Sequence, residues 1–174
     1  MQTVLTTSAQ LSLQKITIMA IEIGQAAPDF GLFDTQKNKV TLSSLQGKNV
    51  LLLFFPQAFT GVCTKELCAI RDDISRYTNS NAEVLGISVD SVFTLGKYKE
   101  EQQYNFPLLS DFNKDVSTLY NTIYTDWILE MKGVSKRSAF VIDKQGIIRY
   151  AEVLESAGDL PNFEAINTTL EQLN

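Results

Sequence analysis

The chain has 174 residues, with 15 lysines and arginines against 20 aspartates and glutamates, two cysteines and no histidine. The length suits one domain whose core needs no disulfide or metal staple, and the net charge of −5 offers no basic surface for nucleic acid. Without histidine, Ser-His-Asp triads, Cys-His pairs and imidazole metal sites are excluded, and two cysteines cannot form a structural zinc site. Any nucleophile must therefore be activated by a group other than imidazole.

The first twenty residues carry one charge, Lys15, among many Ser, Thr and Gln residues. They lack the pattern of a secretory signal and the arginines of a transit peptide. We expect residues 1–20 to be a weakly ordered extension, with Met19 as an alternative start, and residues 21–174 to form one domain. No run approaches the ~18–20 apolar residues that cross a bilayer, so we expect no membrane partner. The low cysteine count favours a reducing compartment, and we expect a cytoplasmic protein.

Strand and helix patterns alternate in the first half of this domain. Val40 to Leu42 predicts a hairpin arm, and the apolar run Asn49 to Phe55 predicts a central strand buried on both faces. Thr64 to Thr78 predicts one helix with Glu66 off its apolar stripe, which consists of Leu67, Ile70, Ile74 and Tyr77. Glu83 to Val89 predicts the next strand, which completes a βαβ unit.

The second half contains two helices, a hairpin and a last helix. Val92 to Tyr104 and Asn113 to Tyr120 predict the helices, with Phe106 to Leu109 between them as a short edge segment. Ser138 to Ile142 and Ile147 to Val153 predict strands joined by a four-residue turn that ends on glycine. The apolar stripe of the closing helix consists of Phe163, Ile166, Leu170 and Leu173.

This order of elements is the thioredoxin-like arrangement with additions. We predict an α/β fold in which helices flank a central mixed sheet, with an N-terminal β-hairpin extension. Flavodoxin-like folds remain competitors on order alone. Neither a glycine-rich dinucleotide signature nor a GxxxxGK[ST] loop follows a strand, so nucleotide-binding relatives lose support.

The segment with most chemistry is Phe54 to Asp73, FFPQAFTGVCTKELCAIRDD. Its strand ends at Pro56, and Cys63 falls at the expected start of a helix, where unpaired amides and the helix dipole favour thiolate over thiol. If Thr60 caps this helix, its hydroxyl approaches the amide of Cys63 and lies beside the sulfur. Glu66, in the expected first turn, acts against the thiolate. Position alone leaves Cys63 equally open to being a small buried hydrophobe.

Pro56-x-x-x-Thr60-x-x-Cys63 resembles the active-site motif of the peroxiredoxin family. The resemblance continues through Phe106 to Asp111 and Gly133 to Asp143, and it covers the chain from Ile23 to the C-terminus. It implies a thiol-dependent peroxidase that reduces hydrogen peroxide and small organic hydroperoxides, with no metal and no bound organic cofactor.

The resemblance also implies a role for each matching residue. Cys63 matches the peroxidatic cysteine, which attacks a peroxide oxygen and becomes a sulfenic acid. Thr60 matches the hydroxyl that binds the peroxide, and Pro56 matches the proline that shields the sulfur from water. Arg137 matches the arginine that holds the thiolate, the alternative being a solvated charge at a strand end. Arg71 is interpreted as an ordinary surface or salt-bridging residue.

Cys68 follows Cys63 by five residues, which places their Cα atoms roughly 8.6 Å apart in an ideal helix. A disulfide needs at most about 7 Å, so the two cysteines cannot pair while the helix is intact. We hypothesise that the first turns unwind after Cys63 is oxidised and that Cys68 then attacks the sulfenic acid. The alternative is a side chain without a role.

Two branches of the family give different expectations for Cys68. Cys-x-x-x-x-Cys resembles the Q-type (bacterioferritin-comigratory) branch, in which the second cysteine resolves the first. FFPQAFTGVCTKEL and the segment after Trp127 resemble the alkyl hydroperoxide reductase E branch, which commonly works with one cysteine. The expected reductant is accordingly a thioredoxin-like protein if Cys68 resolves, or a small thiol if it does not. The expected oligomeric state is a monomer or a homodimer. The large aromatic residues Trp127, Tyr124 and Phe59 are expected to be core or rim residues, or to line a dimer interface.

Two rival functions use the same fold. A thioredoxin-like disulfide reductase is weakened because Thr60-x-x-Cys63 stands where Cys-x-x-Cys would be. A non-enzymatic redox-responsive chaperone would hold client proteins without turning over peroxide.

Overall fold

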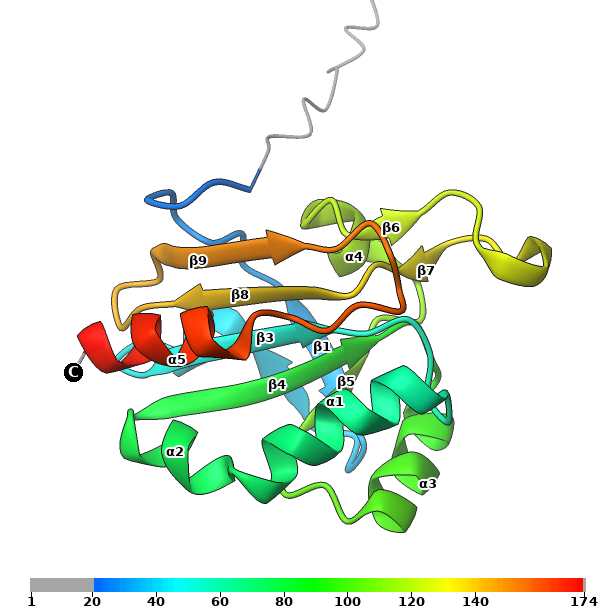
Figure 1. Cartoon of the computed structure of the whole chain (residues 1–174), viewed down its shortest axis with the longest axis horizontal. Coiled ribbons are helices and arrows are strands. Elements are labelled where there is room, and N and C mark those ends of the chain that lie inside the picture. The colour runs from blue at the N-terminus through cyan, green and yellow to red at the C-terminus, as the bar shows by residue number, and fades with distance from the viewer. Residues whose placement is uncertain (1–20, 174) are drawn as a thin grey trace, which may run out of the picture.

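The computed structural model of the chain describes residues 21–173, so the extension expected over residues 1–20 lies outside the described residues. Figure 1 shows one mixed sheet with helices on both sides. The strands of this sheet are β1 (Gly31–Asp34), β2 (Lys39–Thr41), β3 (Asn49–Phe54), β4 (Ala82–Ser88), β5 (Leu108–Ser110), β8 (Ser138–Ile142) and β9 (Ile148–Val153). Their order in space is β2-β1-β5-β4-β3-β8-β9, which confirms the predicted central mixed sheet and the N-terminal hairpin.

The described part of the chain also contains five α-helices and two 3-10 turns. The helices are α1 (Gly61–Asp72), α2 (Ile74–Asn79), α3 (Val92–Gln102), α4 (Asp115–Leu119) and α5 (Phe163–Gln172). The 3-10 turns are η1 (Leu42–Leu45) and η2 (Ile128–Glu130). None of the helices between residues 21 and 173 is long and apolar enough to cross a membrane.

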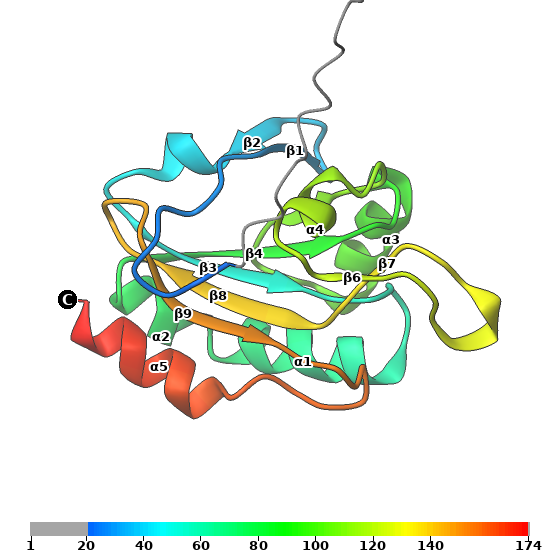
Figure 2. The same ribbon diagram turned by 90° about the horizontal axis from the view of Figure 1, so that it is seen from above.

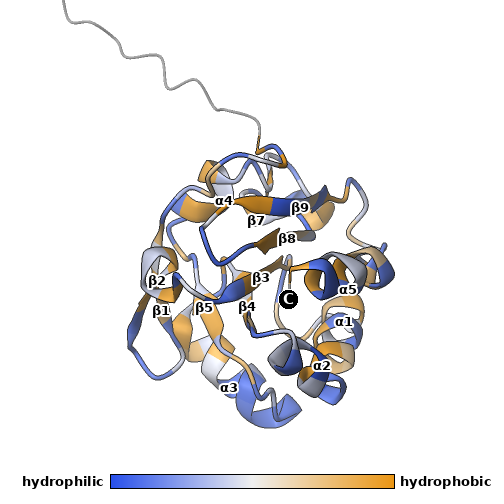
Figure 3. Cartoon of the chain, turned by 90° about the vertical axis from the view of Figure 1, so that its left-hand side faces the viewer, coloured by the Kyte–Doolittle hydropathy of each residue, from blue (hydrophilic) through white to orange (hydrophobic). Residues whose placement is uncertain are grey.

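Strand β3 lies at the centre of the molecule, and all six of its residues are buried. It pairs parallel with β4 and antiparallel with β8. Because side chains alternate along a strand, Leu51 and Leu53 join the core under α1, α3 and α5, whereas Val50 and Leu52 join the core under α4. Figure 2 shows α1, α2 and α5 on one face of the sheet and α4 on the other, and Figure 3 shows β3 and β8 as hydrophobic.

Two predicted elements differ from the structure. The segment Phe106 to Leu109 is wrong as a sheet edge, since β5 pairs with β4 on one side and with β1 on the other. The hairpin of β1 and β2 covers that side of the sheet, and such a long-range pairing leaves no mark in the local pattern. The single helix predicted over Thr64 to Thr78 is interrupted at Asp73, which ends α1 and precedes α2. Aspartate is a poor helix-interior residue because its carboxylate competes with the backbone.

A short arm projects beside the sheet, at the right of Figure 1. It consists of β6 (Ile123–Tyr124), η2 and β7 (Val134–Ser135), and the two strands pair antiparallel. At its tip, Leu129 and Glu130 have φ values of 56° and 59°, in the left-handed region that non-glycine residues rarely adopt. The side chains of Ile128 and Leu129 are exposed there.

Candidate active site

The first side chain of the site comes from the start of α1, at the edge where β3 ends. Cys63 is the third residue of α1, and its side chain is 1 % exposed. Thr60 is the N-cap residue, as predicted, but its hydroxyl makes no hydrogen bond to the amide of Cys63. It donates to the carbonyl oxygen of Gln57 at 2.9 Å, which leaves the lone pairs of the hydroxyl oxygen able to accept another hydrogen bond.

Arg137 enters the site from the strand beside β3. Phe54 pairs with Ser138, so Arg137, one residue before β8, lies level with the end of β3. Arg137 precedes Ala139 by two residues and therefore faces the same core as Cys63. Its Nη2 lies 3.3 Å from the Sγ of Cys63 and donates to the carbonyl oxygen of Ala157 at 2.9 Å. The guanidinium is fully buried, so it is not the solvated strand-end charge of the alternative interpretation.

Glu66 is the residue of this site whose position differs most from expectation. It was expected off the apolar stripe of the helix and in the first turn, but it lies in the second turn and is fully buried. One carboxylate oxygen forms a buried ion pair with Nη1 of Arg137. The other, Oε1, has no hydrogen-bond partner among the described residues. The spacing was the missed signal, because Glu66 follows Cys63 by three residues and so shares its helix face.

The charges of this group influence one another strongly. Burial raises the pKa of Glu66 to about 7, although the charge of Arg137 and its hydrogen bond act to lower it. Burial acts to lower the pKa of Arg137, but the charges of Glu66 and Cys63 outweigh it and raise that pKa. The guanidinium of Arg137 therefore balances the negative charge of a Cys63 thiolate most fully when Glu66 is protonated and neutral.

A cavity of about 380 Å³ opens over Cys63. Four of the five candidate residues named from the sequence line it, namely Pro56, Thr60, Cys63 and Arg137. Much of the remaining wall is apolar and includes Val62, Ala157 and two residues of the arm, Trp127 and Ile128. The rings of Trp127 and Tyr124 stack with their centroids 6.1 Å apart, which supports the arm side of the cavity.

Cys68, the fifth candidate, lies outside this cavity. It is half-buried on α1 and packs against the same core as Leu67. Its Sγ lies 3.7 Å from Oε1 of Gln102, to which the thiol donates. Both cysteines are free, and α1 is continuous from Gly61 to Asp72, so the helical separation between them applies.

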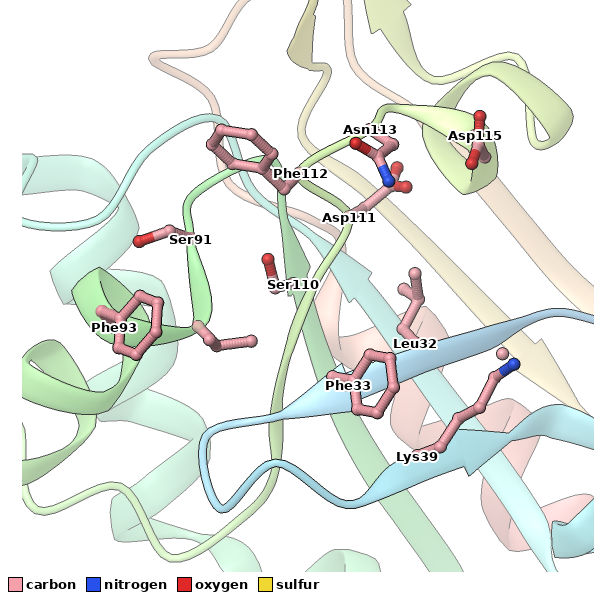
Figure 4. Close-up of a pocket in the computed structure, with 12 residues that line it drawn as sticks. Leu32, Phe33, Lys39, Ser91, Phe93, Ser110, Asp111, Phe112, Asn113 and Asp115 are labelled. Carbon is pink, nitrogen blue, oxygen red and sulfur yellow. The ribbon is translucent and has the colours of Figure 1, made fainter.

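A second cavity, of about 440 Å³, lies near the starts of α3 and α4 (Figure 4). Three exposed phenylalanines surround it, namely Phe33, Phe93 and Phe112. The carboxylate of Asp111 caps α4 through the amides of Val116 and Ser117. No cysteine lines this cavity, so the thiol chemistry belongs to the first one.

A cysteine at a helix start beside a buried guanidinium, on this arrangement of strands and helices, defines a thiol-based redox enzyme. The AhpC/TSA family model matches residues 23–151. The chain belongs to this family and is a thiol-dependent peroxidase of the peroxiredoxin type, an oxidoreductase.

Relatives and solved structures agree with this assignment. Alkyl hydroperoxide reductase E of Mycobacterium tuberculosis is 41 % identical over 136 residues, which cover 76 % of this chain and 86 % of that protein. The mitochondrial thioredoxin-dependent peroxide reductase of Drosophila melanogaster is 34 % identical over 173 residues, covering 94 % of this chain and 70 % of that protein.

Among solved structures, peroxidoxin BcpB of Mycobacterium tuberculosis matches with a TM-score of 0.78 at 29 % identity, covering 88 % of this chain and 99 % of that one. A PrxQ mutant of Xylella fastidiosa also has a TM-score of 0.78, at 23 % identity, with coverage of 88 % and 98 %, and it shows the fold alone. The thioredoxin-like prediction is thereby confirmed over its flavodoxin-like competitor.

Proposed function

We propose that Cys63 is the peroxidatic nucleophile. The supporting observation is the Arg137 guanidinium 3.3 Å from its sulfur, in a chain with no histidine. The thiolate attacks one oxygen of a hydroperoxide, so that an S–O bond forms while the O–O bond breaks. The sulfur is oxidised by two electrons to a sulfenic acid, and the peroxide is reduced to an alcohol or to water, which takes up a proton from solvent.

The other residues of the cavity assist this step. Arg137 holds the thiolate and stabilises negative charge on the departing oxygen, since a preorganised buried cation costs no reorganisation during the reaction. The Thr60 hydroxyl, whose proton is directed to Gln57, accepts a hydrogen bond from the hydroperoxide and orients it. Pro56 is buried, lines the cavity, carries no N–H and excludes water from the sulfur.

The substrates proposed are hydrogen peroxide and organic hydroperoxides. A water-sized molecule occupies about 30 Å³, so a cavity of about 380 Å³ has room for an alkyl group beside the peroxide. The apolar residues Val62, Trp127 and Ile128 would contact that group.

Cys68 is proposed as the resolving cysteine. Its thiol attacks the sulfur of the Cys63 sulfenic acid, an S–S bond forms, and the oxygen leaves as water. Because the intact helix holds the two Cα atoms roughly 8.6 Å apart, this step requires the first turns of α1 to unwind. A dithiol then reduces the disulfide, and a thioredoxin-like protein is the expected donor. If Cys68 does not resolve, a small external thiol takes its place.

The protein is proposed to act in the cytoplasm as a monomer or homodimer, with residues 21–174 as its single domain. A reducing compartment suits a chain whose two cysteines are both free and whose cycle needs a thiol donor. Sedimentation at several concentrations distinguishes the two oligomeric states.

Stopped-flow peroxide reduction by the wild type, C63S and C68S tests the assignment. Trp127, the only tryptophan of the chain, lines the cavity and reports each step by its fluorescence. C63S should lose the peroxide-dependent phase completely. C68S should keep this phase and lose the later one, and mass spectrometry should find an intramolecular disulfide only in the wild type. An unchanged C63S enzyme would refute the nucleophile, and an unchanged C68S enzyme with thioredoxin would refute the resolving role.

A further inference from the structure

One tyrosine of α3 contacts the loop and helix turn on both sides of Cys63. Tyr98 is fully buried, and its phenol oxygen lies 2.8 Å from Oγ1 of Thr64, the residue directly after Cys63. Its ring lies 4.8 Å, centroid to centroid, from the ring of Phe59, the residue directly before the N-cap Thr60. A single side chain from another helix therefore spans the segment that carries the nucleophile.

The direction of the hydrogen bond follows from the other contacts of Thr64. Its hydroxyl donates its one proton to the carbonyl oxygen of Thr60, at 2.8 Å. The phenol of Tyr98 must therefore be the donor to Thr64. The resulting chain runs from Tyr98 through Thr64 to the Thr60 carbonyl, which also accepts the first backbone hydrogen bond of α1 from the Thr64 amide. Tyr98 thus supports the turn that unwinding would have to open.

The loop side of this contact is strained. Phe59 has a φ of 61°, which is unfavourable for a residue with a side chain, and its ring remains 51 % exposed despite its contact with Tyr98. The contact with Tyr98 helps to hold the backbone of Phe59 in this strained conformation, and the strain is released when that contact is lost. The contacts of Tyr98 therefore oppose unwinding of the first turn together with those of Arg137, which holds Cys63 and Glu66 from the other side.

We propose that Tyr98 is a positioning residue for the resolution step: its contacts with Phe59 and Thr64 form a latch that sets how fast Cys68 reaches the oxidised Cys63. This inference rests on the proposed resolving role of Cys68. Thr64 lies directly after Cys63 in the turn that must unwind, so unwinding this turn moves Thr64 away from Tyr98 and breaks their hydrogen bond. A stronger latch lengthens the life of the sulfenic acid and exposes it to a second peroxide, which oxidises it to a sulfinic acid.

Four variants test the latch. Y98F and T64V each remove the phenol–hydroxyl hydrogen bond, whereas T64S keeps a hydroxyl at that position. T78V is the matched control, because Thr78 also donates to the carbonyl four residues earlier, Ile74, but lies in α2, outside the segment between the cysteines. After one equivalent of peroxide, the ratio of the disulfide-forming rate to the peroxide-dependent rate should rise about fivefold in Y98F and T64V, the factor expected for one hydrogen bond of ordinary net strength. T64S and T78V should match the wild type.

Amide hydrogen exchange tests the Tyr98 latch independently of whether Cys68 is the resolving cysteine. Amides of residues 64–67, the first to be hydrogen-bonded within α1, should exchange about fivefold faster in Y98F and T64V, by the same hydrogen-bond strength, and excess peroxide should produce less sulfinic acid at Cys63. Unchanged exchange in both variants overturns the latch, and faster exchange with an unchanged disulfide rate overturns its control of resolution. If the wild type forms no disulfide at all, the proposed function of Cys68 fails, and the exchange rates still decide whether the latch exists.

Discussion

The two cysteines share one helix, yet their surroundings differ in almost every respect. Cys63 lies in the first turn of α1, is 1 % exposed and lies against the guanidinium of Arg137. Cys68 lies in mid-helix, is half-buried and donates to the neutral side chain of Gln102. The structure thus gives one thiol a cation and a helix start, and the other a neutral acceptor. The reactivity of a cysteine is set by such placement rather than by burial alone.

The largest expected effect comes from replacing the arginine that contacts Cys63, with an arginine on the Cys68 side of α1 as the control. R137M should reduce the rate of the peroxide-dependent phase about 100-fold, as for the loss of a buried donor to developing charge. R71M should change that rate less than twofold, because Arg71 binds Asp72 and the Gln102 carbonyl on the Cys68 side of α1. Stopped-flow fluorescence measures both rates.

R137K controls for folding, because it keeps a positive charge beside Glu66. Equal losses in R137M and R71M would show that peroxide reduction does not depend specifically on the guanidinium beside Cys63.

The next effect concerns stability and the buried Glu66. Its folded-state pKa of about 7 lies above the ordinary 4.5, so between these pH values the folded protein keeps a proton that the unfolded chain has lost. The free energy of unfolding should therefore fall as pH rises from 4.5 to 7, by roughly 3 kcal/mol in total. E66Q should lack this fall, as measured by urea denaturation at several pH values.

E83Q is the control for this experiment, because Glu83 pairs with Lys48 at the surface. Parallel pH curves for the wild type and E66Q would show that Glu66 does not ionise in this range.

A smaller effect is expected at the cap of α1. T60V should slow the peroxide-dependent phase about tenfold, because a hydrogen bond to the reacting peroxide is lost while the side-chain volume is kept. T60S should restore most of the rate. If T60V and T60S are equally slow, the methyl group of Thr60 matters rather than its hydroxyl.

The smallest effect concerns the arm rather than the cysteines. I128A should lower the rate with a long-chain alkyl hydroperoxide about threefold relative to hydrogen peroxide, because apolar contact with the alkyl group is lost. L129A is the matched control, since the neighbouring Leu129 is 86 % exposed and does not line the cavity. A similar change in both variants would assign the effect to the arm's stability instead of to substrate contact.

The sequence pattern predicted those features of the fold that depend on residues close together in the chain. The apolar run at β3 and the cysteine at the start of α1 were readable because each depends on neighbours in sequence. The assignment of Arg137 required the family resemblance, because 74 positions separate it from Cys63 and only the pairing of β3 with β8 brings them together. No periodicity encodes such a contact.

Two misses have the same physical origin. Glu66 was grouped with polar residues by its charge, although its spacing from Cys63 placed it on the buried face, where Arg137 compensates it. The β5 segment was assigned to an edge because its β1 partner lies far away in sequence. In both cases a partner distant in sequence stabilises an arrangement that the local pattern does not predict. For Glu66 this arrangement is a buried carboxylate, and for β5 it is a position inside the sheet.

The register between β3 and β8 has a consequence for how the enzyme acquires activity during folding. Because Phe54 pairs with Ser138, a slip of one residue would turn Arg137 to the opposite face of the sheet, away from Cys63. The guanidinium therefore reaches Cys63 only when β8 is paired with β3 in this register. In a refolding reaction, recovery of fast peroxide reduction therefore reports that the centre of the sheet is in register.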